Sequence, residues 1–304
     1  MTIRYIMGRA GAGVDQRAIE EIGTALKQGG EKRLFLLVPE QYTLQAERNL
    51  IEQLQLPGIM QVEVLSFNRL AYRVLAEVGG RNRVLINEQG RNMVLKRVIN
   101  EVARNLTIYK KACKQEGFVE ELSTLFSNFK QYDLDPITLN SRQMEIKEAV
   151  VRQKLQDINL IYEAFNGYMS NQYLDLEDQL NLFIEKLDHS VLLKDARIWL
   201  DGFNHFPPQK RRMIEKIMLQ AQDTTFCLTL DPQPGRDRDL FKISKGCHEQ
   251  IHELASRHGL AEEVIRLDPE KRGQKNRPHA SLMHLEQELY AYPNRSYPTD
   301  SDAI

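Results

Sequence analysis

Short apolar runs alternate with helical periodicity over the first 80 residues of the chain. Three such runs are rich in aliphatic and β-branched side chains and end at glycine, proline or polar residues, which is typical of buried strands. Around them, apolar residues recur every three or four positions, as on one face of a helix. The predicted strands are 3–7, 34–38 and 62–65, and the predicted helices are 16–27, 43–55 and one that follows 66–68. This alternation predicts a parallel β-sheet.

The pattern changes between about residue 87 and residue 187, where strand signals disappear and the period of 3.6 residues dominates. One long helix is predicted at about 146–169. Strand patterns return at 196–200 and 225–230. The chain therefore reads as an α/β domain interrupted by a large all-helical insertion.

The α/β domain is predicted to be discontinuous, at residues 1–80 and 190–265, with the insertion at 81–189. After Asp231 the pattern predicts only loops and a helix. Residues 266–304 are polar and contain prolines, so we expect a partly disordered tail. An apolar core followed by such a tail suggests a fragment of a longer protein.

Composition sets modest limits on function. The 304 residues are 42% hydrophobic and 27% charged, as in ordinary globular proteins, and the formal net charge is −1. Binding to nucleic acid must therefore come from a local basic face. The three cysteines have no metal-ligand spacing and indicate reduced thiols, and a cytoplasmic location is predicted. There is no secretory signal or membrane-spanning stretch in the sequence, so no membrane partner is expected.

The segment 8–15 (GRAGAGVD) has the frame of a phosphate-binding loop, G-x-x-x-x-G-K-[ST], between a predicted strand and a predicted helix. Gly8 and Gly13 occupy the glycine positions. Val14 replaces the lysine that neutralises phosphate, and Asp15 replaces the hydroxyl residue that binds Mg²⁺. The candidate phosphate contacts are Gly8, Arg9, Ala10, Gly11, Ala12 and Gly13. The alternative is a glycine-rich turn without a ligand.

A second candidate is Asp201, which directly follows the predicted strand 196–200. In phosphate-loop NTPases an acidic residue at such a strand end holds Mg²⁺. Gly202 stands where hydrolysing helicases have a glutamate, so the residue that positions the attacking water is missing. Asp201 would hold Mg²⁺ only if a nucleotide binds. Because Asp-Gly is a common turn dipeptide, the structural interpretation is favoured.

Other polar clusters carry weaker signals. His248 and His252 share one helical face, and a solvated pair is favoured over a metal site. The basic runs 210–212 and 271–277 are interpreted as solvated surface.

The order of these segments is similar to that of a known family. The loop GRAGAG is followed by LVPEQ at 37–41, LSFNRLA at 65–71, DLED at 175–178, WLDGF at 199–203 and LTLD at 228–231. The layout resembles the first motor domain of superfamily-one helicases of the UvrD/RecB type, and more closely the AddB component of AddAB helicase–nucleases. The resemblance covers about the first three-quarters of the chain.

The resemblance implies a P-loop NTPase-like sheet, a role in repair of DNA double-strand breaks by recombination, a partner subunit of the AddA type, and binding of single-stranded DNA. It also implies that the nuclease centre and the iron–sulfur cluster lie in a C-terminal region beyond this chain. Many relatives keep the loop lysine that Val14 replaces here, so we expect neither ATP binding nor a catalytic residue in these 304 residues. The predicted DNA-binding residues are Gln41, Ser66, Phe67, Asn68, Arg69 and Arg73.

Three functions remain open from the sequence. The first is a catalytically silent, helicase-like module that binds DNA. The second is a functional ATP-binding helicase domain with an atypical phosphate loop. The third is a scaffold that holds AddA and binds no other ligand.

Overall fold

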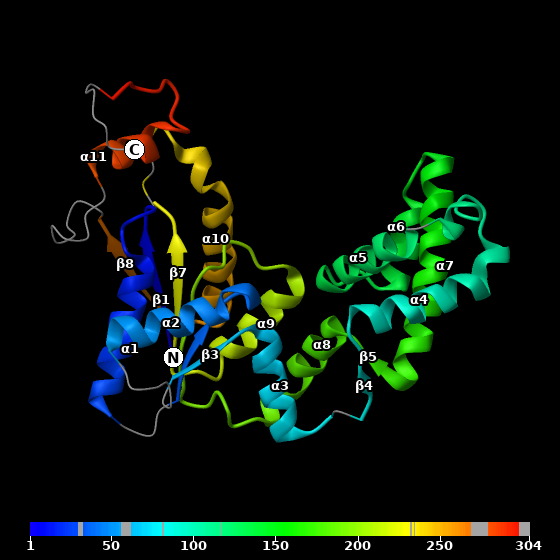
Figure 1. Ribbon diagram of the computed structural model, residues 1–304, viewed down its shortest axis with the longest axis horizontal. Helices are drawn as coiled ribbons and strands as arrows, with labels where there is room; N and C mark the ends of the chain where they lie inside the picture. Colours follow the sequence, from blue (N-terminus) through cyan, green and yellow to red (C-terminus); the bar gives the residue numbers. More distant parts are fainter. Residues whose placement is uncertain are drawn as a thin grey trace. The chain divides into compact units, whose positions relative to one another are not determined.

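A computed structural model describes residues 1–29, 33–55, 62–80, 82–115, 117–231, 233, 235–268 and 279–297. The chain divides into two compact units (Figure 1). The sheet unit consists of Met1–Leu70, Ser190–Phe206 and Ile214–Ile304, and the helical unit consists of Ala71–His189 and Pro207–Met213.

The sheet unit is built on six parallel strands in the order β3-β2-β6-β7-β1-β8. The strands are β1 (Thr2–Gly8), β2 (Leu34–Leu37), β3 (Val62–Leu65), β6 (Arg197–Leu200), β7 (Asp223–Thr229) and β8 (Ala261–Leu267). Because all of them run in one direction, their carboxyl ends meet at one edge of the sheet, called here the carboxyl edge.

Five strands confirm the sequence prediction and β8 corrects it, because only loops and a helix were predicted after Asp231. In β8 the side chains of 261–264 are exposed, and the strand pairs with β1 alone among the described strands. Two consecutive glutamates, Glu262 and Glu263, also interrupt the apolar pattern. Because only Ile265 and Leu267 of this strand pack against the core, its hydrophobic signal in the sequence is too short to predict a strand.

Helices cover both faces of the sheet. On one face, α1 (Val14–Gln28) and α2 (Thr43–Leu54) pack against an apolar core that includes Ile6, Leu36 and Trp199. Tyr5 points to the opposite face, since successive side chains of a strand alternate. There its ring lies 4.7 Å from His248 of α10 (Lys242–Arg257).

The remaining elements of the sheet unit frame its carboxyl edge. Helix α3 (Phe67–Val78) begins directly after β3, and α9 (Pro208–Met218) follows β6; both helices have residues in each unit. Helix α11 (Ala280–Glu288) lies within the tail predicted at 266–304, of which residues 269–278 and 298–304 are outside the described part.

The two units together also contain short 3₁₀ helices, at Glu40–Tyr42, Ala103–Asn105, Ala112–Lys114, Leu187–His189 and Arg238–Phe241.

The helical unit contains the five helices α4 to α8. They are α4 (Glu88–Val102), α5 (Phe118–Gln131), α6 (Pro136–Met144), α7 (Ala149–Gln172) and α8 (Leu176–Lys186). The apolar faces of α4 to α7 share one core, in which Phe126 of α5 contacts Tyr162 and Phe165 of α7. Side chains of Asn87, Asp135 and Asp175 cap the N-termini of α4, α6 and α8.

The insertion was predicted to be all-helical, and this is wrong in one detail. Val84–Leu85 (β4) and Tyr173–Leu174 (β5) form a two-stranded parallel pair. Strands of two residues are too short to produce a period in the sequence. No helix in the described residues is long and apolar enough to cross a membrane.

Candidate functional site

The glycine loop lies where the sequence places it, between β1 and α1 at the carboxyl edge. Gly13 precedes α1 with φ 83°, a left-handed conformation that favours glycine. The Ala12 N–H donates to the Arg9 carbonyl at 3.0 Å. A Cβ on Gly8 would lie 2.8 Å from the Ala12 Cβ, so the loop folds tightly on itself and requires glycine there.

A cavity of about 790 Å³ opens beside this loop. Its wall includes the loop, Asp15 and Gln16 of α1, the segment 201–204 after β6, and Leu289 and Tyr290 after α11. The loop is therefore placed beside a volume large enough for a small ligand.

Arg9, the cation of the loop, is fully engaged by carboxylates. Its guanidinium donates to Asp231 at 3.1 Å, to Asp237, and to Glu286 of α11 at 2.9 Å, and it lies over the ring of Phe241. Burial alone would lower the pKa of Arg9, but the hydrogen bonds from these carboxylates raise it above its ordinary value. The protein itself thus supplies the anions around the residue predicted to contact phosphate.

Two further carboxylates make the cavity acidic. Asp201 follows β6, and its N–H donates to the Leu37 carbonyl at 2.9 Å. Burial, together with the negative charge of Asp15, raises the pKa of Asp201 to about 6. Asp15 also lies in the first turn of α1, where a carboxylate already satisfies the positive end of the helix dipole. A polyphosphate entering this cavity meets like charge.

The turn after Asp201 explains why glycine stands where a catalytic glutamate would be expected. Gly202 has φ 77°, and a Cβ there would lie 3.3 Å from the Cδ of Pro39. A glutamate at this position would meet both backbone strain and a steric conflict.

Of the predicted DNA-binding residues, Gln41, Arg69 and Arg73 are exposed, Asn68 is half-buried, and Ser66 and Phe67 are buried. Gln41 is exposed on the 3₁₀ helix after β2, and Asn68 and Arg69 lie in the first turn of α3 after β3. Because β2 and β3 are neighbours, these three residues come together at the carboxyl edge. The Arg69 side chain is 53% exposed and lies 3.9 Å from Glu40. Arg73 is exposed one turn farther along α3.

Ser66 and Phe67 support the fold around Gln41, Asn68 and Arg69. Ser66 is buried, and its Oγ accepts a 3.3 Å hydrogen bond from the Arg69 N–H, which caps α3. Phe67 is 4% exposed, and its ring centroid lies 5.3 Å from that of Phe203 and 6.5 Å from that of Phe206. With its ring inside this aromatic cluster, Phe67 fixes the start of α3 in the described conformation and offers no open face.

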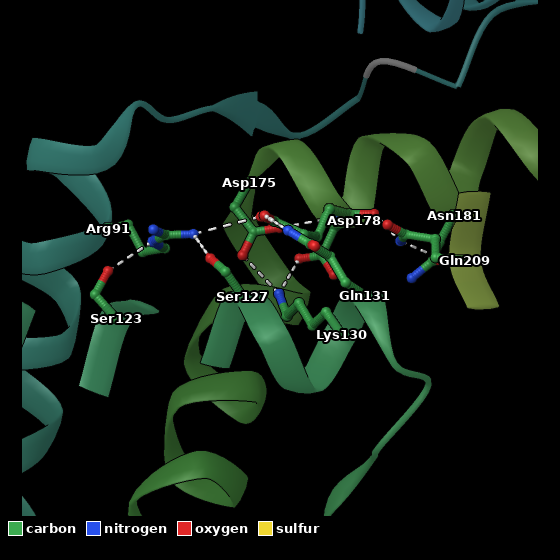
Figure 2. Close-up of polar contacts among 10 residues, drawn as sticks. Arg91, Ser123, Ser127, Lys130, Gln131, Asp175, Asp178, Asn181 and Gln209 are labelled. Carbon is green, nitrogen blue, oxygen red and sulfur yellow. Dashed lines mark hydrogen bonds and ion pairs between the residues drawn. The ribbon is translucent and has the colours of Figure 1, made fainter. Parts of the chain in front are cut away.

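The helical unit contains a buried ionic network that sequence reasoning missed (Figure 2). The Lys130 ammonium of α5 donates to Asp175 at 2.6 Å and to Asp178 at 2.8 Å. Asp175 also caps α8 by accepting from the Asp178 N–H at 2.8 Å. The segment DLED at 175–178 thus anchors α8 on α5.

The network continues from α8 to α4 and α9. Arg91 of α4 donates to Ser123, to Ser127 and, at 3.4 Å, to Glu177. Gln209 donates to the Glu177 carbonyl at 2.8 Å and to Asn181, which lies beside it in Figure 2. The only sequence signal was the spacing of acidic residues before an apolar run, which indicates a helix start and not its partners.

Burial controls the ionisation of this network. Burial would lower the pKa of Lys130, but Asp175 and Asp178 raise it above its ordinary value. Burial raises the pKa of Asp178, and the negative charge of Asp175 adds to this rise, while Lys130 opposes it. A buried ionic network of this kind stabilises the fold only while its charges stay paired.

The basic run 210–212 is not simply solvated surface. Arg212 donates to Asp133, and to Asn181 at 3.1 Å. Burial lowers the pKa of Lys210. The run 271–277 lies outside the described residues.

The histidine pair belongs to the packing of α10. His252 contacts Glu262 at 2.9 Å, and His248 packs edge-on against the Tyr5 ring. Within the described ranges no three His, Cys, Asp or Glu side chains form a group that could hold a metal ion.

Comparisons with known proteins identify the family. A family model described as "ADDB, N-terminal" matches residues 5–286. The B subunit of the ATP-dependent helicase/deoxyribonuclease of Alkaliphilus metalliredigens is 44% identical over 98% of this chain and 26% of its own length. The proteins of the same name from Alkaliphilus oremlandii and Clostridium kluyveri are 44% and 34% identical, over 98% and 100% of this chain and 26% and 27% of their own lengths.

The chain therefore spans about a quarter of the length of these curated relatives. Their shared name describes each of them as one subunit of an enzyme, which implies a partner subunit for each. Since the family model covers most of the chain, from β1 into α11, the chain belongs to the AddB family and corresponds to its N-terminal part.

Proposed function

We propose that this chain is the N-terminal module of an AddB-type helicase–nuclease subunit, and that it binds single-stranded DNA without hydrolysing ATP. In this proposal it acts in the cytoplasm, in recombinational repair of double-strand breaks, with an AddA-type partner subunit. The observation that carries the DNA-binding role is the group Gln41, Asn68 and Arg69 at the carboxyl edge. Gln41 and Arg69 are exposed and Asn68 is half-buried, so polar and cationic side chains there can reach phosphate oxygens.

The proposal includes a P-loop NTPase-like ancestry for the sheet unit. The glycine loop ends β1, Asp201 ends β6, and β7 lies between these two strands. Two strand spacings correspond to roughly 10 Å, so the loop and the acidic residue face one cavity. We propose the discontinuous domain 1–80 and 190–265 as this motor-like core, with 81–189 as its insertion.

Loss of ATP chemistry is supported by three separate features. Val14 cannot neutralise phosphate, Asp15 adds negative charge, and Arg9 is held by three carboxylates. Phosphoryl transfer depends on positive groups and Mg²⁺ around the transferred phosphate. In this proposal the nuclease centre and the iron–sulfur cluster belong to the region of the relatives that this chain does not match, and none of the present residues takes part in them.

Replacing both Arg69 and Arg73 with glutamine is expected to weaken binding of single-stranded DNA and to reduce its salt dependence. The slope of log K against log salt should fall by roughly 1.4, because each lost phosphate contact on a single strand contributes about 0.7. Fluorescence anisotropy with a labelled oligonucleotide at several salt concentrations measures both quantities. The matched control replaces Arg97 and Arg142, which are exposed arginines of the helical unit. Equal salt slopes for the test variant, the control and the parent would contradict the assignment of Arg69 and Arg73 to DNA binding.

Calorimetric titration with ATP and Mg²⁺ is expected to show no binding in the micromolar range, because the cavity is acidic and lacks the loop lysine. A variant with Val14→Lys and Asp15→Thr restores the two missing side chains and shows whether they account for the loss. Micromolar binding of ATP to the parent chain would instead support the functional NTPase alternative.

The scaffold alternative is separated by a capture experiment. An AddA-type subunit retained by this chain in the absence of DNA, together with no DNA binding by the chain, would support a pure scaffold.

A further inference from the structure

The helical unit carries a group of cations that no carboxylate of the described residues neutralises. Residues 103–115, between α4 and α5, contain four cations and no acidic residue, and residues 149–156 at the start of α7 contain two cations and no acidic residue. On a chain whose net charge is −1, such segments concentrate positive charge locally. The five most exposed of these groups are called here the basic patch: Arg104, Lys110, Lys111, Lys114 and Lys154.

Asp157 brings the two segments together. This residue of α7 is 3% exposed, and its carboxylate accepts hydrogen bonds from three consecutive backbone N–H groups, those of Thr107, Ile108 and Tyr109, at 2.7 to 3.0 Å. Lys154 lies three residues earlier on α7 and therefore on the same helical face as Asp157. The segment between α4 and α5 is thus held against the part of α7 that carries Asp157 and Lys154.

The cations of the basic patch are available to a ligand. None of the five has a carboxylate of the described residues within 4.0 Å, whereas Arg4, Arg9, Arg91 and Arg212 all do. Asp157 directs its oxygens to peptide N–H groups and not to these side chains. Binding an anion here therefore breaks no ion pair with a described residue, and the fixed backbone limits the entropy that binding would cost.

The chemistry of the basic patch selects among polyanions. Four of its five members are lysines, which act as point charges suited to phosphate and not as base-reading groups. Proteins that hold unpaired strands add aromatic rings on which bases stack. The one aromatic residue of the segment, Tyr109, is half-buried, with its ring 5.6 Å from that of Phe118.

We propose that the basic patch binds the phosphate backbone of double-stranded DNA. The surface extends the proposed function, because it would hold duplex DNA on the helical unit while the carboxyl edge of the sheet unit holds a single strand. It uses none of the residues assigned to single-strand binding, so the two sites can fail independently.

The test uses the chain with Lys110→Gln, Lys111→Gln and Lys114→Gln, in anisotropy titrations with a labelled blunt-ended duplex and a single strand of the same length. Loss of three phosphate contacts should reduce the salt slope for the duplex by roughly 2.7 and its affinity at least about tenfold at low salt. Affinity for the single strand should change less. The matched control replaces Lys27, Lys194 and Lys242, which are exposed lysines of the sheet unit, and should keep most of the duplex affinity.

Four results would overturn the proposal. The first is that the parent chain does not bind duplex DNA at low salt, and the second is that the variant keeps the salt slope of the parent for the duplex. The third is that the control loses as much duplex affinity as the variant. The fourth is that the variant loses equal affinity for the duplex and for the single strand. Duplex binding that is retained while capture of an AddA-type partner is lost would assign the basic patch to an acidic protein surface instead. The Arg69 and Arg73 variant, tested on the same duplex, should bind it like the parent, which separates this site from the proposed single-strand site.

Discussion

Replacement of Lys130 by methionine is expected to lower the free energy of unfolding by about 3–5 kcal/mol, because it leaves buried carboxylates without their cation. Lys130 is the ammonium that Asp175 and Asp178 share, and its side chain is 7% exposed. Methionine has nearly the same length, so the loss measures charge pairing more than packing. Urea unfolding followed by far-ultraviolet circular dichroism measures the change.

Two further variants make this prediction specific. Lys96→Met removes an exposed lysine of α4 and should change stability by less than about 0.5 kcal/mol. Combining Lys130→Met with Asp175→Asn and Asp178→Asn removes the unpaired charges and should recover part of the loss, since neutral replacement of a buried ionic group is often tolerated. A cost below about 1 kcal/mol for Lys130→Met alone would show that the network contributes little to the fold.

Asp201→Asn is expected to stabilise the chain at neutral pH and to have no such effect below about pH 4. The pKa of Asp201 is about 6 in the folded chain against an ordinary value of 3.8. Between these values the folded state binds more protons than the unfolded state, so stability falls as the pH rises. Each pKa unit corresponds to about 1.4 kcal/mol, which gives a penalty approaching about 3 kcal/mol above pH 6. Asparagine cannot ionise, so the variant does not have this stability penalty.

The measurement is the free energy of unfolding from urea titrations at several pH values between 4 and 8, about the range in which the carboxyl titrates. Asp195→Asn, at an exposed position, is the control and should shift stability by less than about 0.5 kcal/mol at every pH. If Asp201→Asn shows a constant difference from the parent over the whole range, the raised pKa is not the cause.

The sequence predicts those parts of the fold whose burial is periodic. β2 and residues 198–200 of β6 are buried on both faces and appear as continuous apolar runs, and α7 shows its core-facing stripe. The exposed strand β8 shows no such signal. Family membership could also be recognised, because short segments in a fixed order are specific together.

The site residues show where sequence reasoning ends. Arg9 was predicted to face phosphate, yet its partners Asp231, Asp237 and Glu286 lie more than 220 positions away in the chain. Lys130 and Asp175 are 45 positions apart. Asp157 and the segment that it pins are about 50 positions apart. Pairings of this kind depend on tertiary contact, and no local pattern in one sequence encodes them.

The strand order also has a consequence for synthesis of the chain. β1 is made first, but its neighbours in the sheet are β7 and β8, and Arg4 of β1 meets Thr225 of β7 across a separation of 221 residues. The contacts among α4 to α8 all lie within one continuous stretch of chain. On the ribosome, which releases the N-terminus first, the helical unit can assemble early. The apolar strand β1 stays unpaired until the last third of the chain emerges, so this strand is the region most in need of protection from aggregation during translation.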